Sequence, residues 1–321
     1  MSFNFITRTG SGALIPEQFN EDLLQGLELN SAALQMLPRV DMGVAETRMS
    51  VLSALPMVNW GTGDLTSYNT SEMDWTNRYL DAAEVYAVVP VPRKVLRDTS
   101  LDLWGQVSGP TIAKMSQLID SAIFLNVNFP SQWTTNSAAI ASTAVSRSHG
   151  YTRGTNAAGA GGLGEDINQV MAKVEADGFP VNFAVGSPSF KAKIRSARDT
   201  LGQRLMDFTR GEGGASSYAL ADGTPLTFAI DGGWTTGTGA YELILGDRKQ
   251  GILGMRQDVE VDFLKESTFF DANGKVILSL GQQDAIAMKI TMRIGFVTAN
   301  IPTLMNENNS TRWPFAVLVS P

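Results

Sequence analysis

The fold is decided by residues 48–96, where two long extended stretches enclose a polar segment. RMSVLSALPMVNW (48–60) and YLDAAEVYAVVPVPRKVL (79–96) have the pattern of β-strands, and GTGDLTSYNTSEMDWTN (61–77) between them has no core pattern. We therefore expect a long β-hairpin with a loose tip, over residues 45–93, that protrudes from the body. The alternative is a loop folded back on its own domain. A protruding hairpin of this length is marginally stable alone and needs a neighbour to cover it.

Composition and charge limit the classes of protein. The chain has 321 residues, of which 43% are hydrophobic, so it can build a core and is not wholly disordered. Its net charge is −7, which argues against a dedicated nucleic-acid binder because such proteins carry basic patches. Most of the negative balance lies in residues 1–93, where five Arg face eleven acidic residues and no Lys occurs. Only 18% of residues are charged, so the surface is rich in neutral polar groups or is covered by partners.

Few catalytic or metal-binding residues are available. The sequence has no cysteine, which excludes disulfides, thiolate metal sites and thiol nucleophiles. Its one histidine, His149, would have to serve in any Ser-His-Asp triad. The N-terminus lacks the pattern of a signal peptide, and no window approaches 18 apolar residues. We expect an intracellular, soluble protein that is not an enzyme, has no cofactor and does not enter a membrane.

The rest of the chain predicts helices first and strands later, which is an α+β fold. Apolar spacing predicts helices over residues 17–37, 98–128, 165–178 and 188–206, a loop over 131–164 and a buried strand over 181–187. Gly109-Pro110 interrupts the second helix, so we expect a kink or two abutting helices there. From residue 218 onward short β-runs dominate, and DANGK (271–275) predicts a hairpin turn.

Three local patterns resemble functional motifs, and each has a simpler interpretation. GAGGLG (159–164) matches G-x-G-x-x-G, but a polar loop rather than a strand precedes it, which favours a flexible linker over a dinucleotide site. His149 has no accompanying nucleophile motif and is interpreted as an exposed or locally bonded loop residue. A basic helix face could contact phosphate, or it could be solvated or paired with acidic neighbours; its residues are Lys191, Lys193, Arg195 and Arg198.

The order of segments resembles the major capsid proteins of tailed bacteriophages, of the Hong Kong 97-type fold, over most of the chain. LIPE (14–17) and the following helix resemble the family's N-terminal arm, and PMVNW (56–60) with Trp75 resembles the flanks of its extended E-loop. VPVP (89–92), LRDT (96–99) and DSAI (120–123) are similar to the start and end of its long spine helix. The block around GSPSF (186–190) and DGTPL (222–226) resembles its axial (A) domain, and residues 246–297 resemble its peripheral (P) domain.

The resemblance implies a division of the chain into an N-terminal arm (1–44), an E-loop hairpin (45–93), a spine helix with the start of the P domain (94–130), a mainly A-domain region with a flexible loop at 131–164 (131–240) and a P-domain sheet that returns to the A domain (241–321). It also implies a shell protein whose hexamers and pentamers enclose double-stranded DNA in an icosahedral phage head, assembled in the bacterial cytoplasm. An encapsulin-like nanocompartment is the alternative with the same fold, and an enzyme of unknown kind is a third hypothesis. The implied partners are other copies of the chain, a portal protein, a decoration protein and DNA that is contacted weakly and without sequence preference.

Two departures from the family pattern shape the expectations. Some members cross-link an E-loop lysine to a P-domain asparagine with the help of a glutamate; here the E-loop has no lysine, and SLGQQ (279–283) has no glutamate, although Asn273 stands roughly where the asparagine would be. We therefore expect a shell without covalent links. The family's N-terminal scaffolding segment is missing, and Met1 favours a separate scaffolding protein over proteolytic removal. Candidate interface residues are Trp60, Asp64, Tyr68, Glu72, Trp75, Arg78 and Asn273, with the two tryptophans as anchors or, alternatively, as packing within the subunit. Gly109 and Pro110 are the candidate spine-helix kink.

Overall fold

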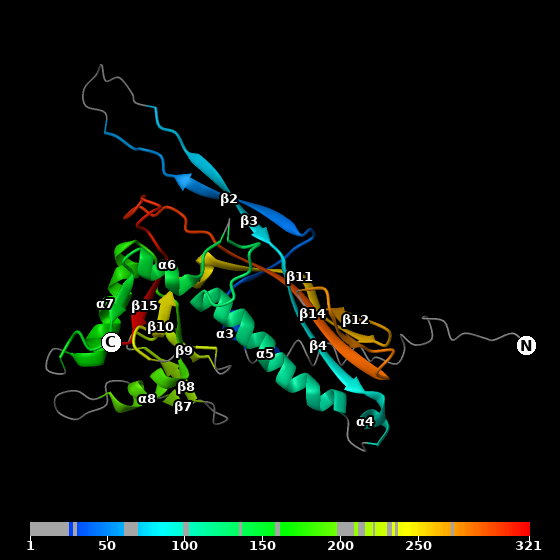
Figure 1. Cartoon of the computed structure of the whole chain (residues 1–321). Coiled ribbons are helices and arrows are strands. Elements are labelled where there is room, and N and C mark those ends of the chain that lie inside the picture. The colour runs from blue at the N-terminus through cyan, green and yellow to red at the C-terminus, as the bar shows by residue number, and fades with distance from the viewer. Residues whose placement is uncertain are drawn as a thin grey trace, which may run out of the picture.

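The computed structural model combines two β-sheets, a long helix and a projecting hairpin (Figure 1). It describes residues 26–27, 31–60, 70–98, 103–134, 137–157, 161–197, 209–210, 216–220, 222–229, 233–234, 237–270 and 273–321. The predicted α+β class is confirmed, with strands dominating after residue 218. In the described part of the chain, no helix has the length and hydropathy needed to cross a membrane.

The first sheet has four strands in the order β1–β11–β14–β4. Their bounds are Arg39–Asp41, Gly251–Leu264, Ala285–Thr298 and Ala83–Pro92. β14 is central and pairs antiparallel with both β11 and β4. Alternate side chains of β14 point into the main core, as the two-residue period of a strand requires; they are Met288, Ile290, Met292, Ile294 and Phe296.

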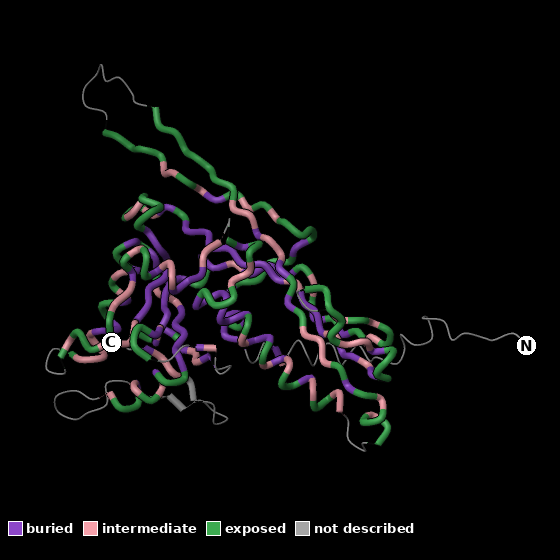
Figure 2. Tube along the Cα trace, viewed as in Figure 1, coloured by how far each residue is buried: buried purple, intermediate pink, exposed green. Residues whose placement is uncertain are grey.

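The second sheet has seven strands in the order β5–β15–β10–β6–β9–β8–β7. Their bounds are Gly150–Thr152, Phe315–Val319, Tyr241–Gly246, Phe183–Gly186, Pro225–Phe228, Ser216–Ala219 and Thr209–Arg210. Along β10, Leu243 and Leu245 pack under helix α7 (Gly162–Ala176), whereas Ile244 points to the opposite face and joins the main core. One hydrophobic core therefore underlies both sheets (Figure 2). β10 pairs antiparallel with β6, so residues 241–246 lie in the same sheet as the strand at 183–186, and the expected division of the chain at residue 241 stays a prediction.

The long helix α5 (Leu103–Leu125) runs across the body and links the two sheets (Figure 1). It includes Pro110 without a break, so the expectation of two abutting helices is wrong. Pro110 has no N–H group, so one carbonyl of the preceding turn lacks its usual helical partner. Gly109 and Pro110 are exposed, so this carbonyl lies on the outer side of the helix. In the same turn, Thr111 Oγ1 donates to Val107 O at 2.8 Å. A bend at this point stays a prediction.

A buried carboxylate on α5 holds the segment that precedes the first sheet. Asp120 accepts hydrogen bonds from Ser31 Oγ (2.6 Å), Ala32 N (2.7 Å) and Ala33 N (3.0 Å), the first turn of helix α3 (Ala32–Met36). Ser31 has extended backbone and caps α3. The helix expected over 17–37 is therefore interrupted at Ser31, because the cap starts a new helix. Residues 1–25 and 28–30 of the expected arm lie outside the described residues.

The projecting hairpin is formed by β2 (Glu46–Ala54) and β3 (Asp74–Asp81), which pair antiparallel. The expectation that it reaches residue 93 is wrong, because the chain leaves the hairpin at Ala82 and continues as β4 in the four-stranded sheet. The physical reason is burial: Ala83 and Val85 face the main core, so this stretch has a better partner in β14 than in β2. Residues 61–69, at the expected tip, lie outside the described residues.

Two facing glycines create the space for the base of the hairpin. Gly254 of β11 and Gly295 of β14 are paired in register. A Cβ on Gly254 would lie 2.5 Å from the Leu80 side chain, and one on Gly295 would lie 2.8 Å from the Asp81 carbonyl oxygen. Leu80 is fully buried there, and Trp133 Nε1 donates to the same Asp81 oxygen at 2.8 Å. The four-stranded sheet can thus pack against the base of the hairpin because Gly254 and Gly295 have no side chains at the point of contact.

The segment expected as a loop over 131–164 is largely structured. It contains helix α6 (Ile140–Ser146), strand β5 and the first turn of α7. Ile140, Ala141 and Ala144 of α6 are buried in the main core, and alanine and serine give too weak a pattern to be recognised in the sequence. Helix α8 (Pro188–Ser196) ends at Ala197, where the backbone is extended, so the predicted helix over 188–206 is interrupted there; residues 198–206 lie outside the described residues. The DANGK hairpin is confirmed as β12 (Thr268–Phe270) paired with β13 (Val276–Ser279), and α4 (Arg93–Asp98) follows β4.

We expect Gly295→Ala to destabilise the unassembled chain by about 1–3 kcal/mol, because the added methyl group forces the hairpin base away from the sheet. The measurement is chemical denaturation followed by circular dichroism. Gly281→Ala is the matched control: nothing lies within 4 Å of its Cβ position, so its free energy of unfolding should stay within about 1 kcal/mol of wild type. Equal stability of the two variants would contradict the assigned role of the glycine pair.

Candidate subunit-contact surfaces

The histidine does not lie in an exposed loop, as one interpretation held, but is buried and paired. His149 Nε2 lies 2.9 Å from Asp177 Oδ2, and Nδ1 lies 2.9 Å from the Arg147 carbonyl oxygen. Asp177 also accepts hydrogen bonds from Trp313 N (2.8 Å) and Asn306 Nδ2 (2.7 Å). Both ring nitrogens and both carboxylate oxygens are thus engaged by the protein itself. The arrangement ties the end of α7 to the segment before β15.

The glycine-rich motif forms a turn that its own neighbours complete. Gly161 adopts a φ of 95° at the N-cap of α7, while Gly159 and Ala160 lie outside the described residues. Asp166 of α7 accepts hydrogen bonds from Gly154 N (2.6 Å) and Asn156 N (3.1 Å). These contacts fold the preceding loop onto the start of the helix, where a dinucleotide phosphate would have to lie.

The basic face of α8 pairs within the subunit. Lys193 Nζ bonds to Glu242 Oε1, and Arg153 Nε bonds to the other oxygen of this buried carboxylate at 2.8 Å. Lys191 Nζ lies over the rings of Tyr218 and Phe228, at 4.9 and 5.4 Å. Arg198 lies outside the described residues. Elsewhere in the described ranges, no three acidic or histidine side chains gather in a way that could hold a metal ion.

The distal half of the β2–β3 hairpin carries uncovered apolar side chains. Trp60 is 96% exposed, Val58 is 91% exposed and Trp75 is 63% exposed; Met57 and Met73 are also exposed. The hairpin extends away from the rest of the described chain (Figures 1 and 2). Monomeric proteins rarely leave such apolar clusters in water, so these side chains form a candidate interaction surface.

The remaining candidate interface residues are spread over the molecule. Glu72 is exposed on the distal hairpin, and Arg78 is half-buried at its base. Asn273 lies between β12 and β13 in the chain. Figure 1 shows β12 far from the β2–β3 hairpin. Asp64 and Tyr68 lie outside the described residues. Contacts between the hairpin and the Asn273 turn would therefore have to form between different copies of the chain.

A second apolar surface, which sequence reasoning missed, covers one face of the β12–β13 hairpin. Phe270, Val276 and Ile277 are exposed, while Phe269 and Leu278 on the other face pack against Leu280. A two-stranded sheet can bury only one of its faces against its own body. The apolar run KVILSL (275–280) contained this signal, because both alternating faces of the strand are apolar.

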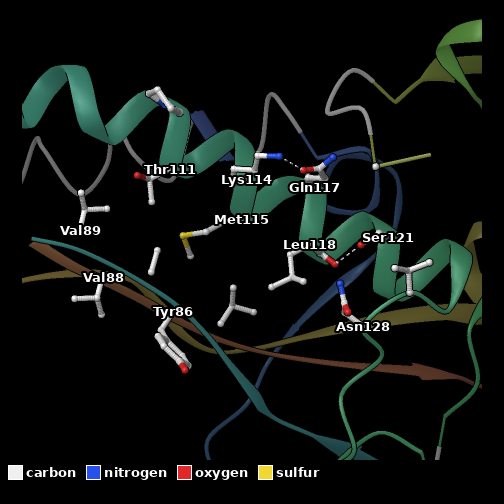
Figure 3. Close-up of a pocket in the computed structure, with 15 residues that line it drawn as sticks. Tyr86, Val88, Val89, Thr111, Lys114, Met115, Gln117, Leu118, Ser121 and Asn128 are labelled. Atoms are coloured by element: carbon white, nitrogen blue, oxygen red, sulfur yellow. Dashed lines mark hydrogen bonds between the residues drawn. The ribbon is translucent and has the colours of Figure 1, made fainter. Parts of the chain in front are cut away.

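A third feature is an open groove of about 650 Å³ between α5 and β4 (Figure 3). Met115 and Leu118 of α5 line one side of it and Val85 and Val89 of β4 line the other, while Lys114 Nζ donates to Gln117 Oε1 at 2.8 Å along the helix. Tyr86 is mostly exposed. The groove lies between the half-buried sides of α5 and β4, which come from different parts of the chain. No single stretch of sequence therefore predicts it.

Comparisons with known proteins identify the family to which the chain belongs. The model of the phage capsid family matches residues 11–300. Among solved structures, a chain of Microbacterium phage Oxtober96 is 27% identical, covers 99% of this chain and 100% of its own, and superposes with a TM-score of 0.76. A chain of Mycobacterium phage Bobi has the same identity and TM-score, with 99% of each chain covered. A capsid chain of a native GTA particle shares the fold at 15% identity and a TM-score of 0.60, over 92% of this chain and 90% of its own. A search of curated proteins gave no match. The chain therefore belongs to the phage capsid family.

Proposed function

We propose that this chain is the major capsid protein of a tailed phage, of the Hong Kong 97 type, and that hexamers and pentamers of it close into an icosahedral head around double-stranded DNA. The observation that carries the proposal is the uncovered apolar hairpin in a member of the phage capsid family. A shell subunit resolves this exposure, because each copy can lie over its neighbour.

The energetics favour the hairpin as an assembly device. A large aromatic side chain buries about 150–250 Å² and dominates the interfaces in which it lies. Trp60 has nearly all of its surface available, since it is 96% exposed in the single subunit. The packing of Trp60 within its own subunit, the alternative considered above, has no support among the described residues.

The expected role of DNA is confinement rather than tight binding. A chain of net charge −7 has few cations to spare for phosphates, and several of its basic side chains pair internally, as Lys193 and Arg153 do with Glu242. A separate scaffolding protein, a portal and a decoration protein are the further partners that we propose, with assembly in the host cytoplasm before the protein resides in the virion.

Assembly tests both the function and its anchor. We expect the purified chain, with its scaffolding protein where one is required, to form closed shells in negative-stain electron microscopy. Trp60→Ser should raise the concentration needed for assembly at least tenfold, because an interface anchor of this kind contributes about 2 kcal/mol or more per contact. Ser50→Ala, an exposed position on the same hairpin, should assemble like wild type.

The outcomes separate the hypotheses. A monodisperse monomer under every condition would contradict the shell function. Small shells that carry protein cargo and no genome would indicate the nanocompartment instead. Normal assembly of Trp60→Ser would remove Trp60 as an anchor but leave the shell in place. Circular dichroism of each unassembled variant checks that folding is unchanged, as expected for side chains that touch little of their own subunit.

The shell is proposed to be held together without covalent links. The hairpin offers no lysine for an isopeptide bond, since the first lysine of the chain is Lys94. Denaturing gel electrophoresis of mature particles should therefore show a single band near 34.5 kDa. A ladder of multimers that survives boiling and reducing agent would contradict this.

A further inference from the structure

A cluster of three arginines surrounds a small polar cavity at the base of the hairpin. The cavity measures about 120 Å³ and is lined by Arg78 of β3, Arg147 after α6, and Ser137, Thr298, Asn300, Trp313 and Ala138. A smaller cavity of about 50 Å³ adjoins it, sharing Arg78 and Asn300 and adding Arg312. Liquid water takes up about 30 Å³ per molecule, so the larger space holds several waters or one small anion.

Three arginines gather here, and the carboxylates that act on the two buried ones are those of Asp177 and Glu307. Arg147 Nη1 donates to Arg312 O at 2.6 Å, and its guanidinium lies 4.6 Å from the centre of the Trp313 ring. Arg312 is 1% exposed and donates to Asn306 O and Asn300 O. The guanidinium group of Arg78 forms no hydrogen bond or ion pair within the described residues. The nearby carboxylate of Asp177 is already held by His149, Asn306 and Trp313.

The electrostatics of the cluster agree with this geometry. Burial lowers the pKa of Arg147, repulsion from Arg78 lowers it further, and Asp177 opposes both effects. Burial likewise lowers the pKa of Arg312; Asp177 and Glu307 raise it, while Arg147 and Arg78 lower it. Like charges held together out of water are costly unless an anion lies among them.

Several side chains that line the two cavities have buried polar atoms without a hydrogen-bond partner in the protein. Thr298 Oγ1, Asn300 Oδ1 and Arg312 Nε are buried without a hydrogen-bond partner in residues that are 5%, 5% and 1% exposed, and Ser137 Oγ is also unpaired. Buried polar atoms are nearly always satisfied, so four orphans around adjoining cavities need an explanation. Three of the four can donate, as can Arg78, and this set matches the oxygens of an anion.

We propose that this cavity is a binding site for an oxyanion, which joins Arg78 of the hairpin to Arg147 of the body. The oxyanion is either free phosphate or a carboxylate from another copy of the chain. Exposed carboxylates such as Glu72 and Asp74 of the acidic hairpin have the complementary charge. Hydrogenphosphate has an O–H group that can donate to Asn300 Oδ1, whereas a carboxylate leaves that oxygen to a water.

Phosphate binding to the unassembled chain tests the site. Inorganic phosphate is titrated by calorimetry at constant ionic strength, at low millimolar concentrations where general salt stabilisation is small. We expect saturable binding that Arg78→Gln weakens at least tenfold. Arg48→Gln, an exposed arginine on the same hairpin that does not line either cavity, should bind like wild type.

A second variant guards against misfolding of the first. Thr298→Val keeps the shape of the side chain and removes its unpaired hydroxyl, so the phosphate-free protein should be at least as stable as wild type while phosphate binding weakens. Absence of saturable binding by wild type, or equal binding by wild type, Arg78→Gln and Thr298→Val, would overturn the proposal.

Assembled particles identify the source of the oxyanion. If a neighbouring copy supplies a carboxylate, particles will not bind phosphate at this site although the free chain does; if the ligand is a free anion, both will bind it alike. This arm rests on the shell function proposed above. The free-chain titration needs only the folded subunit, so a failure of the site and a failure of the shell are distinguishable.

Discussion

The β2–β3 hairpin is a two-stranded sheet that its own subunit covers only at the base. Leu80 lies in the notch made by Gly254 and Gly295, and Val51 is buried nearby, but the side chains beyond them face water. Two strands alone are marginally stable, and the apolar surface of Trp60 and its neighbours adds a cost of exposure. The hairpin therefore depends on a partner for stability. In a capsid protein, the expected partner is another copy of the same chain.

The rest of the subunit is built to hold that hairpin in one direction. A single hydrophobic core joins both sheets through α5, so the four-stranded sheet cannot shift without disturbing the seven-stranded one. Asp120 fixes α3 and the chain leading to β1 onto the same helix. The exposed apolar residues of the β12–β13 hairpin lie apart from those of the projecting hairpin (Figure 1). A subunit with two separated apolar surfaces is suited to building a lattice, because each contact between subunits fixes the orientation of the following subunit.

Sequence reasoning recovered the features that local pattern controls. The α+β class, the buried strand before α8, the Asn-Gly hairpin and the existence of a projecting hairpin follow from periodicity and turn chemistry. The sequence predictions were wrong where contacts with residues far away in the chain determine the local structure. The hairpin ends at Ala82 because the following strand pairs with β14 and buries Ala83 and Val85. Helix α6 forms because its alanines fit the core. Helix α5 tolerates Pro110 because that position faces outward. The cavity at Arg78 could not be predicted from the sequence for the same reason, since Arg147, Thr298 and Arg312 come from separate parts of the chain. Arg78 and the two tryptophans were selected by their place in the hairpin, and their role in contacts stays a prediction.

Hydrogen–deuterium exchange of the free and the assembled chain tests most directly whether a neighbouring copy covers the hairpin. We expect amides in residues 55–60 and 70–73, beyond the paired and covered base of the hairpin, to exchange rapidly in the unassembled chain and at least a hundredfold more slowly in closed shells, while β11 and β14 are protected in both. Equal exchange of these residues in the two states would show that assembly leaves the hairpin uncovered, and that no neighbouring copy stabilises it.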